Sequence, residues 1–480
     1  MILKPLIIVH RYVGVILGII MTLWCLSGFV MMYQPYPDTI SEEHQAGLAP
    51  LDLSHCCAAT PLADDATAKS YRVEMLNGTA VLRTIGADGP RTYELATGAE
   101  LVKLSEAAVK QAAETYAAGN GIAGKITELG TLAVDQWSVQ GAKRWQPLWR
   151  AVFDDPAATW IYVNGKTGEI VQDVNGHERF WNWLGAIPHW LYPTVLRENV
   201  PLWTQVVIWS SAIGCFLVIT GMIIGFSKLR GKSGAWWPYK RPMWMFHHVF
   251  GTFAGILVLT WTFSGLMTMS PWGLFESESA VSRDDLGGAM TWKDMRAAIE
   301  AVKTDETANL VAIRSAPQLG KPIAFAQQSD GGQIRFDPAG RAPFSHKELE
   351  TGLAEKGGLL ASGKLETLTT EDDYYYGHKQ AVALPVYRVT LTDPEQTRVY
   401  VNAKTGELER LADGTSQRYR WLESGLHSLD FSFLRARPVW DIVTLILLAA
   451  VTLACATGAW LSFTRIGTDV SRMKEFFRRR

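Results

Sequence analysis

Four long apolar stretches constrain the fold of this chain more than any other feature. They cover residues 6–33, 202–226, 243–269 and 439–463. Each is long enough to cross the hydrocarbon core of a bilayer, which takes about 20 helical residues. Of the 480 residues, 48% are hydrophobic and 19% are charged, which excludes a disordered chain. We therefore predict a membrane protein with four transmembrane helices.

Basic residues predict which side of the membrane each segment faces. The N-terminus, residues 227–242 and residues 465–480 together carry thirteen basic and two acidic residues, so they should face the cytoplasm. Residues 34–200 and 271–437 are acidic overall and should lie in the periplasm. We expect a multi-pass protein in the lipid bilayer of the bacterial inner membrane, with both termini cytoplasmic. The first apolar stretch should be a retained anchor, because Tyr33-Gln34-Pro35 does not resemble a signal-peptide cleavage site.

The second half of the chain repeats the first at an offset of 237 to 238 residues. Six residues of the first stretch recur in the third: His10, Gly14, Gly18, Trp24, Ser27 and Gly28 match His247, Gly251, Gly255, Trp261, Ser264 and Gly265. Two parallel repeats, related by a pseudo-twofold axis along the membrane normal, follow from this register. The expected segments are a first transmembrane helix (1–33), a first periplasmic region (34–200), a second transmembrane helix (201–226), a basic cytoplasmic loop (227–242), a third transmembrane helix (243–270), a second periplasmic region (271–437), a fourth transmembrane helix (438–464) and a basic cytoplasmic tail (465–480).

The periplasmic regions carry a pattern of helix, strands and a Lys-Thr-Gly-Glu turn that resembles the PepSY domain. The pattern is clearest in residues 104–171, and residues 291–340 and 345–409 repeat it. The expected fold class is therefore a membrane α+β protein. A four-transmembrane-helix bundle is built from two parallel repeats, each with a periplasmic α+β PepSY-type domain.

Four histidines stand at equivalent positions of the two repeats, near the membrane boundaries. His10 and His247 lie at the cytoplasmic ends of the first and third stretches, and His189 and His427 lie just before the second and fourth stretches, at the outer face of the membrane. Ionisable residues at membrane depth are costly and point to function. The pseudo-twofold axis would bring each pair face to face, as two axial ligands of one haem iron require. We expect two haems, one in each leaflet.

The residues around these histidines suit a flat cofactor. Four and eight positions after each inner histidine the chain has a glycine, namely Gly14, Gly18, Gly251 and Gly255. Their missing side chains would leave room for a porphyrin, although this spacing also serves helix packing. The absence of a Cys-x-x-Cys-His motif indicates haem b, and the lack of nearby thiolates disfavours zinc. His248 competes with His247 as the ligand, and a lone interfacial histidine can simply anchor a helix.

Three further features leave alternatives open. Trp24 and Trp261 fall between the two histidine pairs, where they could relay electrons or fill the interior. His55-Cys56-Cys57 could bind a metal, form a vicinal disulfide or be an ordinary loop. The cluster containing Tyr375 and His378 could contact an iron chelate or lie on a solvated strand edge.

These motifs together resemble the PepSY-associated transmembrane family, whose members are similar to ferric-siderophore reductases and iron-uptake proteins. The resemblance rests on His10-Arg-Tyr-x-Gly14, on Tyr400-Val-Asn-x-x-Thr-Gly-Glu407 and on Arg420-Trp-Leu-x-x-Gly-Leu-His427-Ser-Leu-Asp430. It implies two b haems that carry electrons outward to a periplasmic ferric siderophore or another iron(III) chelate. A quinol or a separate cytoplasmic-side reductase would be the donor, and no nucleic-acid partner is expected.

Two other classes of function remain open. A non-enzymatic membrane-anchored regulator would use its PepSY domains to bind peptides or proteases and would hold no haem. A permease would need polar residues at mid-membrane, and the four stretches offer few of these.

Overall fold

The computed structural model describes residues 3–57, 59–86, 89–230, 234, 236, 239, 241–274, 276, 279–305, 309–378 and 381–478. Four of the basic residues that predicted orientation, Lys232, Lys240, Arg479 and Arg480, lie outside the described residues. The chain forms two compact units, each assembled from both halves of the sequence. The helical unit comprises Met1–Tyr36, Phe180–Glu276 and Thr415–Arg480, and the sheet unit comprises Pro37–Arg179 and Ser277–Gly414.

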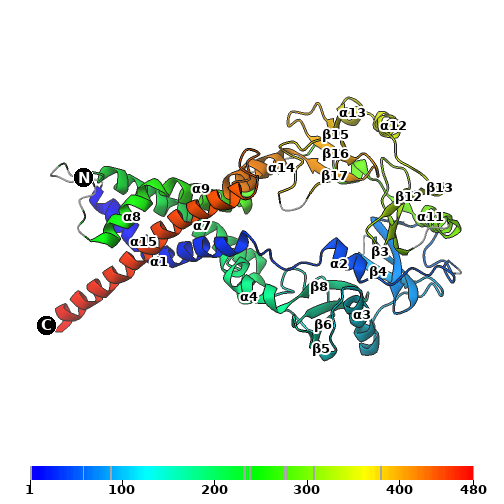
Figure 1. Ribbon diagram of the computed structural model, residues 1–480, viewed down its shortest axis with the longest axis horizontal. Helices are drawn as coiled ribbons and strands as arrows, with labels where there is room; N and C mark the ends of the chain where they lie inside the picture. Colours follow the sequence, from blue (N-terminus) through cyan, green and yellow to red (C-terminus); the bar gives the residue numbers. More distant parts are fainter. Residues whose placement is uncertain are drawn as a thin grey trace. The chain divides into compact units, whose positions relative to one another are not determined.

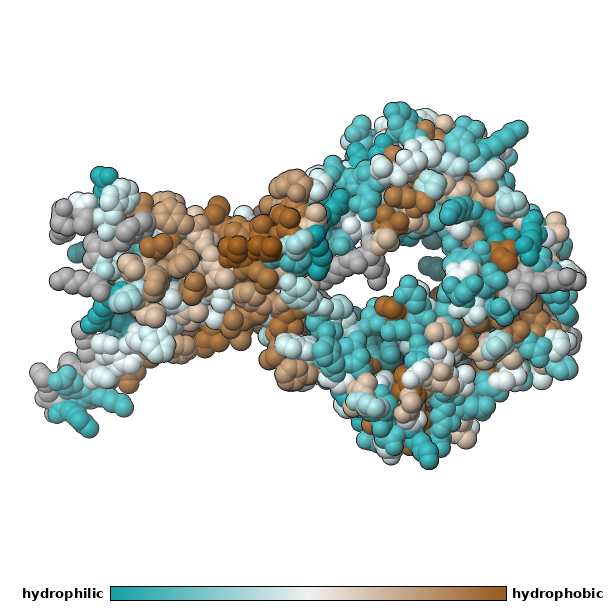
Figure 2. Space-filling view, in the orientation of Figure 1, coloured by the Kyte–Doolittle hydropathy of each residue, from teal (hydrophilic) through white to brown (hydrophobic). Residues whose placement is uncertain are grey.

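Long apolar helices dominate the helical unit (Figure 1). Three of them are long and apolar enough to cross a membrane: α1 (Leu3–Met31), α7 (Val200–Ser227) and α15 (Val439–Arg478). Many of their large apolar side chains are exposed, as the apolar surface of these helices in Figure 2 shows. An exposed apolar surface of this extent needs lipid around it. The chain is therefore a membrane protein with transmembrane helices.

The third predicted stretch is bent. Its two parts, α8 (Pro242–Phe253) and α9 (Gly255–Thr268), are long enough to cross a membrane only together, and they meet at an angle of 59°. Gly251 and Gly255 flank the bend, and glycine weakens a helix at a kink. The side chain of Met222 also occupies the space beside Gly255, where a Cβ would stand 2.9 Å from its Cγ.

The helices of this unit pack around an apolar interior. Helix α1 contacts α7 and α15, α15 contacts α8, and α7 contacts α9. The buried cluster between them contains Leu17, Met21, Leu217, Ala254, Val258, Leu448 and Val451. The shorter helical elements are α4 (Gly176–Leu184), α5 (Ala186–His189), α6 (Thr194–Arg197), the 3-10 helix η1 (Pro271–Gly273), α14 (Gly414–Tyr419) and the π-helix η2 (Arg420–His427).

A seven-stranded antiparallel sheet forms the centre of the sheet unit and takes strands from both predicted periplasmic regions. Its order is β13-β12-β11-β10-β2-β3-β4. The halves meet where β2 (Ser70–Leu76) pairs with β10 (Leu310–Ser315), with Val73 opposite Ile313. The other strands are β3 (Thr79–Gly86), β4 (Gly89–Glu94), β11 (Ala324–Gln328), β12 (Gln333–Asp337) and β13 (Gly340–Arg341), and β1 (Thr67–Ala68) pairs with β9 (Met290–Thr291). The sequence did not predict the pairing of β2 with β10. This pairing covers one edge strand from each half, so neither strand is left as an open sheet edge.

Two four-stranded antiparallel sheets complete the unit, one from each half. The first consists of β5 (Ile126–Leu132), β6 (Leu148–Phe153), β7 (Trp160–Asn164) and β8 (Ile170–Val174), with α3 (Glu106–Gly119) against it. The second consists of β14 (Lys364–Leu368), β15 (Val386–Thr390), β16 (Arg398–Asn402) and β17 (Leu408–Ala412). The remaining helices are α2 (Ser41–Ala46), α10 (Arg283–Leu286), α11 (Trp292–Thr304), α12 (His346–Lys356) and α13 (Gly358–Ala361).

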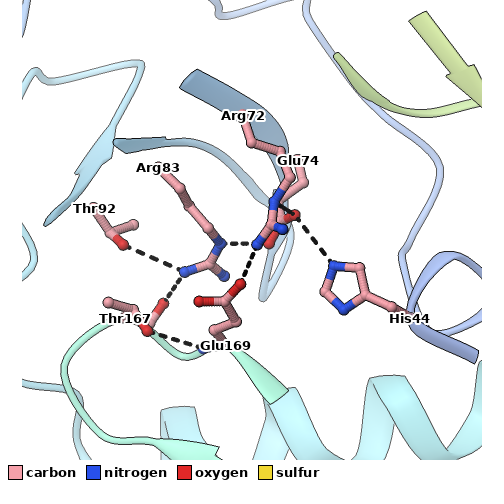
Figure 3. A network of polar contacts seen from close by, with 7 residues as sticks. All are labelled: His44, Arg72, Glu74, Arg83, Thr92, Thr167 and Glu169. Carbon is pink, nitrogen blue, oxygen red and sulfur yellow. Dashed lines mark hydrogen bonds and ion pairs between the residues drawn. The ribbon is translucent and has the colours of Figure 1, made fainter. Parts of the chain in front are cut away.

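The Lys-Thr-Gly-Glu turns fasten the four-stranded sheets to the seven-stranded one. Glu169 pairs with Arg72 on β2, and its counterpart Glu407 pairs with Arg314 on β10 at 2.7 Å. Figure 3 shows the first of these networks, in which the buried carboxylate of Glu74 lies beside Arg72 and Arg83. Burial alone would raise the pKa of Glu74, but the two guanidinium groups lower this pKa far below its usual range. The motif thus has a structural role in both halves.

Candidate functional site

The structure brings the four predicted histidines together as two pairs within the helical unit. The imidazole rings of His10 on α1 and His247 on α8 have their centroids 6.3 Å apart, at an interplanar angle of 29°. The rings of His189, at the end of α5, and His427, at the end of η2, have their centroids 5.9 Å apart, at 73°. Each pair consists of residues that the repeat register had matched. We call His10 and His247 the inner pair, and His189 and His427 the outer pair.

Backbone carbonyl groups hold the inner pair. The Nδ1 atom of His10 lies 3.1 Å from the Leu217 carbonyl oxygen, and that of His247 lies 3.1 Å from the Ala454 carbonyl oxygen. A hydroxyl group also lies near Nδ1 in the inner pair, that of Thr220 at 3.3 Å from His10 and that of Thr457 at 3.5 Å from His247. A carbonyl oxygen can only accept, so Nδ1 carries the proton and donates it. Each Nε2 therefore keeps its lone pair free to bind a metal.

The outer pair is held in the same way, by one carbonyl and one hydroxyl group at each ring. The Nδ1 atoms of His189 and His427 lie 3.2 and 3.1 Å from carbonyl oxygens, and 3.0 and 3.1 Å from hydroxyl oxygens. The carbonyl groups belong to Trp24 and Trp261, and the hydroxyl groups belong to Ser27 and Ser264. Metal-binding histidines usually donate their other ring N–H in this manner, which fixes the tautomer and the ring orientation.

The spacing of the rings suits two trans ligands of one metal ion. A metal–imidazole bond of about 2 Å and a distance of about 1.2 Å from the nitrogen to the ring centre place two such centres about 6.4 Å apart. The separations of 6.3 and 5.9 Å are close to this value. Among the described residues no group of three or more His, Cys, Asp or Glu could hold a bare metal ion. Two imidazoles alone fit a metal that brings its other ligands with it, as haem iron does.

Two glycines that the sequence analysis overlooked adjoin the inner pair. A Cβ atom at Gly221 would stand 2.6 Å from Cε1 of His10, and one at Gly458 would stand 2.8 Å from Cε1 of His247. Any side chain at either position would therefore collide with the imidazole. The signal was available, because Thr220-Gly221 and Thr457-Gly458 recur at the repeat offset.

The glycines predicted to make room for a porphyrin have mixed surroundings. Cβ atoms at Gly14, Gly18 and Gly255 would meet Ser462, Ala459 and Met222 of neighbouring helices, at 3.4, 3.2 and 2.9 Å. These three glycines therefore allow close helix packing, the alternative that the sequence left open. A Cβ at Gly251 would instead lie 3.8 Å from the ring of His247.

His248 faces away from the inner pair. Its Nε2 lies 2.8 Å from the Gly225 carbonyl oxygen on α7, and its ring contacts Tyr239. His248 therefore joins α8 to α7, and His247 is the residue that faces His10.

Two features in the sheet unit are not part of this site. Tyr375 is 4% exposed, stacks on Tyr400 at 5.0 Å and donates its hydroxyl to the Ala383 carbonyl. Burial raises the pKa of Tyr375 to about 12. His378 lies half-buried in the same loop. Of the alternatives for Cys56 and Cys57, the structure contains the vicinal disulfide.

Comparison with known families identifies two matching regions. The family described as PepSY-associated TM region matches residues 7–335, which is more than half of the chain. The family described as Peptidase propeptide and YPEB domain matches residues 359–411, the region of the second four-stranded sheet. A search of curated proteins found no match to the chain.

Proposed function

The chain belongs to the family of PepSY-associated transmembrane proteins, and from this premise we propose that it is a di-haem b oxidoreductase. It passes electrons across the bacterial inner membrane and reduces a ferric siderophore or another iron(III) chelate in the periplasm. One observation carries the proposal. Four histidines form two pairs with ring centroids about 6 Å apart, and each ring has Nδ1 anchored by a carbonyl group, which leaves Nε2 as the nitrogen that could bind iron.

Matched contacts in the two halves support a four-helix bundle of two parallel repeats. The pair His10 and Leu217 recurs as His247 and Ala454 at an offset of 237 in both members. The bond from Ser27 to His189 likewise has a counterpart in the second half. A pseudo-twofold axis that relates α1 to α8 and α9 together would account for both sets of contacts, and α8 with α9 would then act as one bent span.

Each histidine pair would form one redox site. Haem, when bound, supplies a one-electron redox centre. The two imidazoles of each pair would hold the haem iron and would leave no position on it for a substrate, which suits electron transfer. The carbonyl groups fix the imidazole tautomer and raise the basicity of the imidazoles, and the apolar helices keep water away from the sites.

The two sites lie one above the other along the same helices. On α1, His10 belongs to the inner site, and the Trp24 carbonyl, which holds His189, belongs to the outer one. These residues are 14 positions apart, or about 21 Å along a helix. Electrons enter from a quinol or a cytoplasmic-side reductase and leave to the iron(III) chelate, and reduction weakens the hold of the chelate on its iron.

A dithionite-minus-oxidised absorbance spectrum of the purified protein, with haem counted per chain, tests the proposal. We expect b-type bands at two haems per chain, and loss of one haem in His10→Ala and in His427→Ala. His346→Ala, at an exposed position of the sheet unit, should keep both haems. A protein that stays colourless when expressed with ample haem would refute the proposal.

The second family match favours one alternative. The chain would then be a membrane-anchored regulator that binds peptides or proteases through residues 359–411. This alternative predicts no haem, so the same spectrum distinguishes the two functions.

A further inference from the structure

The two tryptophans between the histidine pairs have a matched position in both halves. Trp24 on α1 and Trp261 on α9 are 237 residues apart, the offset that also relates the inner histidines. We propose, on the basis of the proposed function, that their indole rings form the path by which electrons pass from the inner site to the outer site.

The backbone of each tryptophan already belongs to the outer site. The Trp24 carbonyl oxygen accepts from Nδ1 of His189, and the Trp261 carbonyl oxygen accepts from Nδ1 of His427. A helical carbonyl points towards the C-terminus of its helix, whereas the side chain leans back towards the N-terminus. The N-terminal direction along these helices leads towards His10 and His247. Each indole therefore extends from the outer site towards the inner one.

The side chains of Trp24 and Trp261 are partly buried in the helical unit. Trp24 and Trp261 pack against the buried cluster that contains Leu17, Met21 and Val258. Leu17 and Met21 lie between His10 and Trp24 in the sequence, and Val258 occupies the equivalent place before Trp261. The two indoles are thus next to the side chains that separate the two sites.

The indole N–H groups give a reason to prefer a functional role over simple packing. The Nε1 atoms of both tryptophans are buried and have no hydrogen-bond partner among the residues that the structure describes. A buried donor without a partner destabilises the protein, and phenylalanine or leucine would fill the same space without that cost. The recurrence of this costly choice in both halves indicates that the chain uses the indole π system itself.

The step needs no chemical change of the indoles. One electron leaves the inner site and the same electron arrives at the outer site, so the tryptophans are neither oxidised nor reduced overall. The large aromatic rings provide a better medium for electron tunnelling than aliphatic side chains across the same gap. Removing them should slow the transfer while the driving force stays the same.

The experiment compares the full-length haem-loaded protein with the double variants Trp24→Phe/Trp261→Phe and Trp24→Leu/Trp261→Leu. Trp209→Leu is the matched control, because this tryptophan is 53% exposed on α7. Each protein is reduced in liposomes and mixed with ferricyanide, which does not cross the bilayer. Reoxidation should have a fast phase from the outer site and a slow phase from the inner one. We expect the slow phase to slow roughly tenfold in the leucine variant and roughly threefold in the phenylalanine variant, with the control unchanged.

Haem content, the reduced absorbance bands and the midpoint potentials are measured on the same samples. Unchanged values with a slower slow phase support the proposal, because neither the ligands nor the driving force has then changed. An unchanged slow phase in variants that keep both haems overturns it. If the leucine variant loses a haem, the phenylalanine variant decides by the same criterion. A wild-type protein without haem would instead mean that the proposed function itself has failed.

Discussion

The contact between Gly221 and His10 allows a sharp test of the inner site. In Gly221→Ala the new Cβ would lie 2.6 Å from Cε1 of His10, whereas carbon atoms in contact are normally about 3.5–4.0 Å apart. The ring or α7 must therefore move by about 1 Å. The ring cannot turn aside freely, because its Nδ1 is bound to the Leu217 carbonyl of the same helix, α7.

Overpacking of this kind costs about 1–3 kcal/mol, which corresponds to roughly 5- to 150-fold weaker retention of the inner haem. The assay is the rate of haem transfer to excess apomyoglobin, together with the haem count per chain. Only one of the two haems should be affected. The helix itself should not suffer, because alanine is a better helix former than glycine by about 0.8–1.0 kcal/mol.

Gly467→Ala provides the control, since a Cβ at that position of α15 meets no atom within 4 Å. It should retain both haems at the wild-type rate. The reasoning would be refuted if Gly221→Ala released its haem no faster than Gly467→Ala.

Three further predictions concern the outer site and the sheet unit. Ser264→Ala removes one of the two acceptors of the His427 N–H, a loss of about 0.5–1.5 kcal/mol, and should raise the outer midpoint potential by roughly 20–65 mV in spectroelectrochemistry. Glu74→Gln leaves Arg72 and Arg83 without the buried carboxylate between them, so it should lower the unfolding free energy, measured by urea titration, by about 3–5 kcal/mol. Because the pKa of Glu74 is lowered in the folded state, the stabilisation by this carboxylate is present above the ordinary glutamate pKa and declines as the pH falls below it. Burial, with a contribution from Glu43, raises the pKa of Asp173 to about 7 in the folded protein. This carboxyl group therefore destabilises the fold increasingly as the pH rises from its unfolded-state pKa to about 7. Asp173→Asn should raise the melting temperature at pH 8 and leave it nearly unchanged at pH 3, and a decrease at pH 8 would contradict the reasoning.

The pairing of the histidines could be predicted from the sequence because the repeat register carries long-range information. Matched positions in two parallel repeats must face each other across one axis, so His10 and His247 were predicted together although 237 residues separate them. Their Nδ1 partners could not be predicted. A carbonyl group such as that of Leu217 is present at every residue, and only the packing of α1 against α7 selects it.

Other features escaped the sequence analysis for related physical reasons. Hydropathy reports the length of an apolar segment but not its straightness, so the bend between α8 and α9 was not predicted. Alternation of apolar residues indicates a strand but not its neighbour, so the pairing of β2 with β10 was not predicted either. The glycine spacing was ambiguous because close helix packing and room for a cofactor require the same small residue. Only the atoms opposite Gly18 and Gly221 distinguish the two uses.

The carbonyl groups that hold the histidines belong to the long helices, and this affects the spacing of the two sites. The inner histidines are held by carbonyl groups of α7 and α15, and the outer histidines are held by carbonyl groups of α1 and α9. Helix α1 thus contributes a histidine at one end and a carbonyl that holds another histidine near the other end, and α8 and α9 together do the same in the second half. In the first half, the spacing between His10 and the Trp24 carbonyl is therefore set by the rise of the continuous helix α1, about 1.5 Å per residue, and not by a loop. A duplicated stretch that carries both a histidine and a tryptophan consequently holds parts of both sites, and the aromatic path that we propose between them, in one stretch of each half.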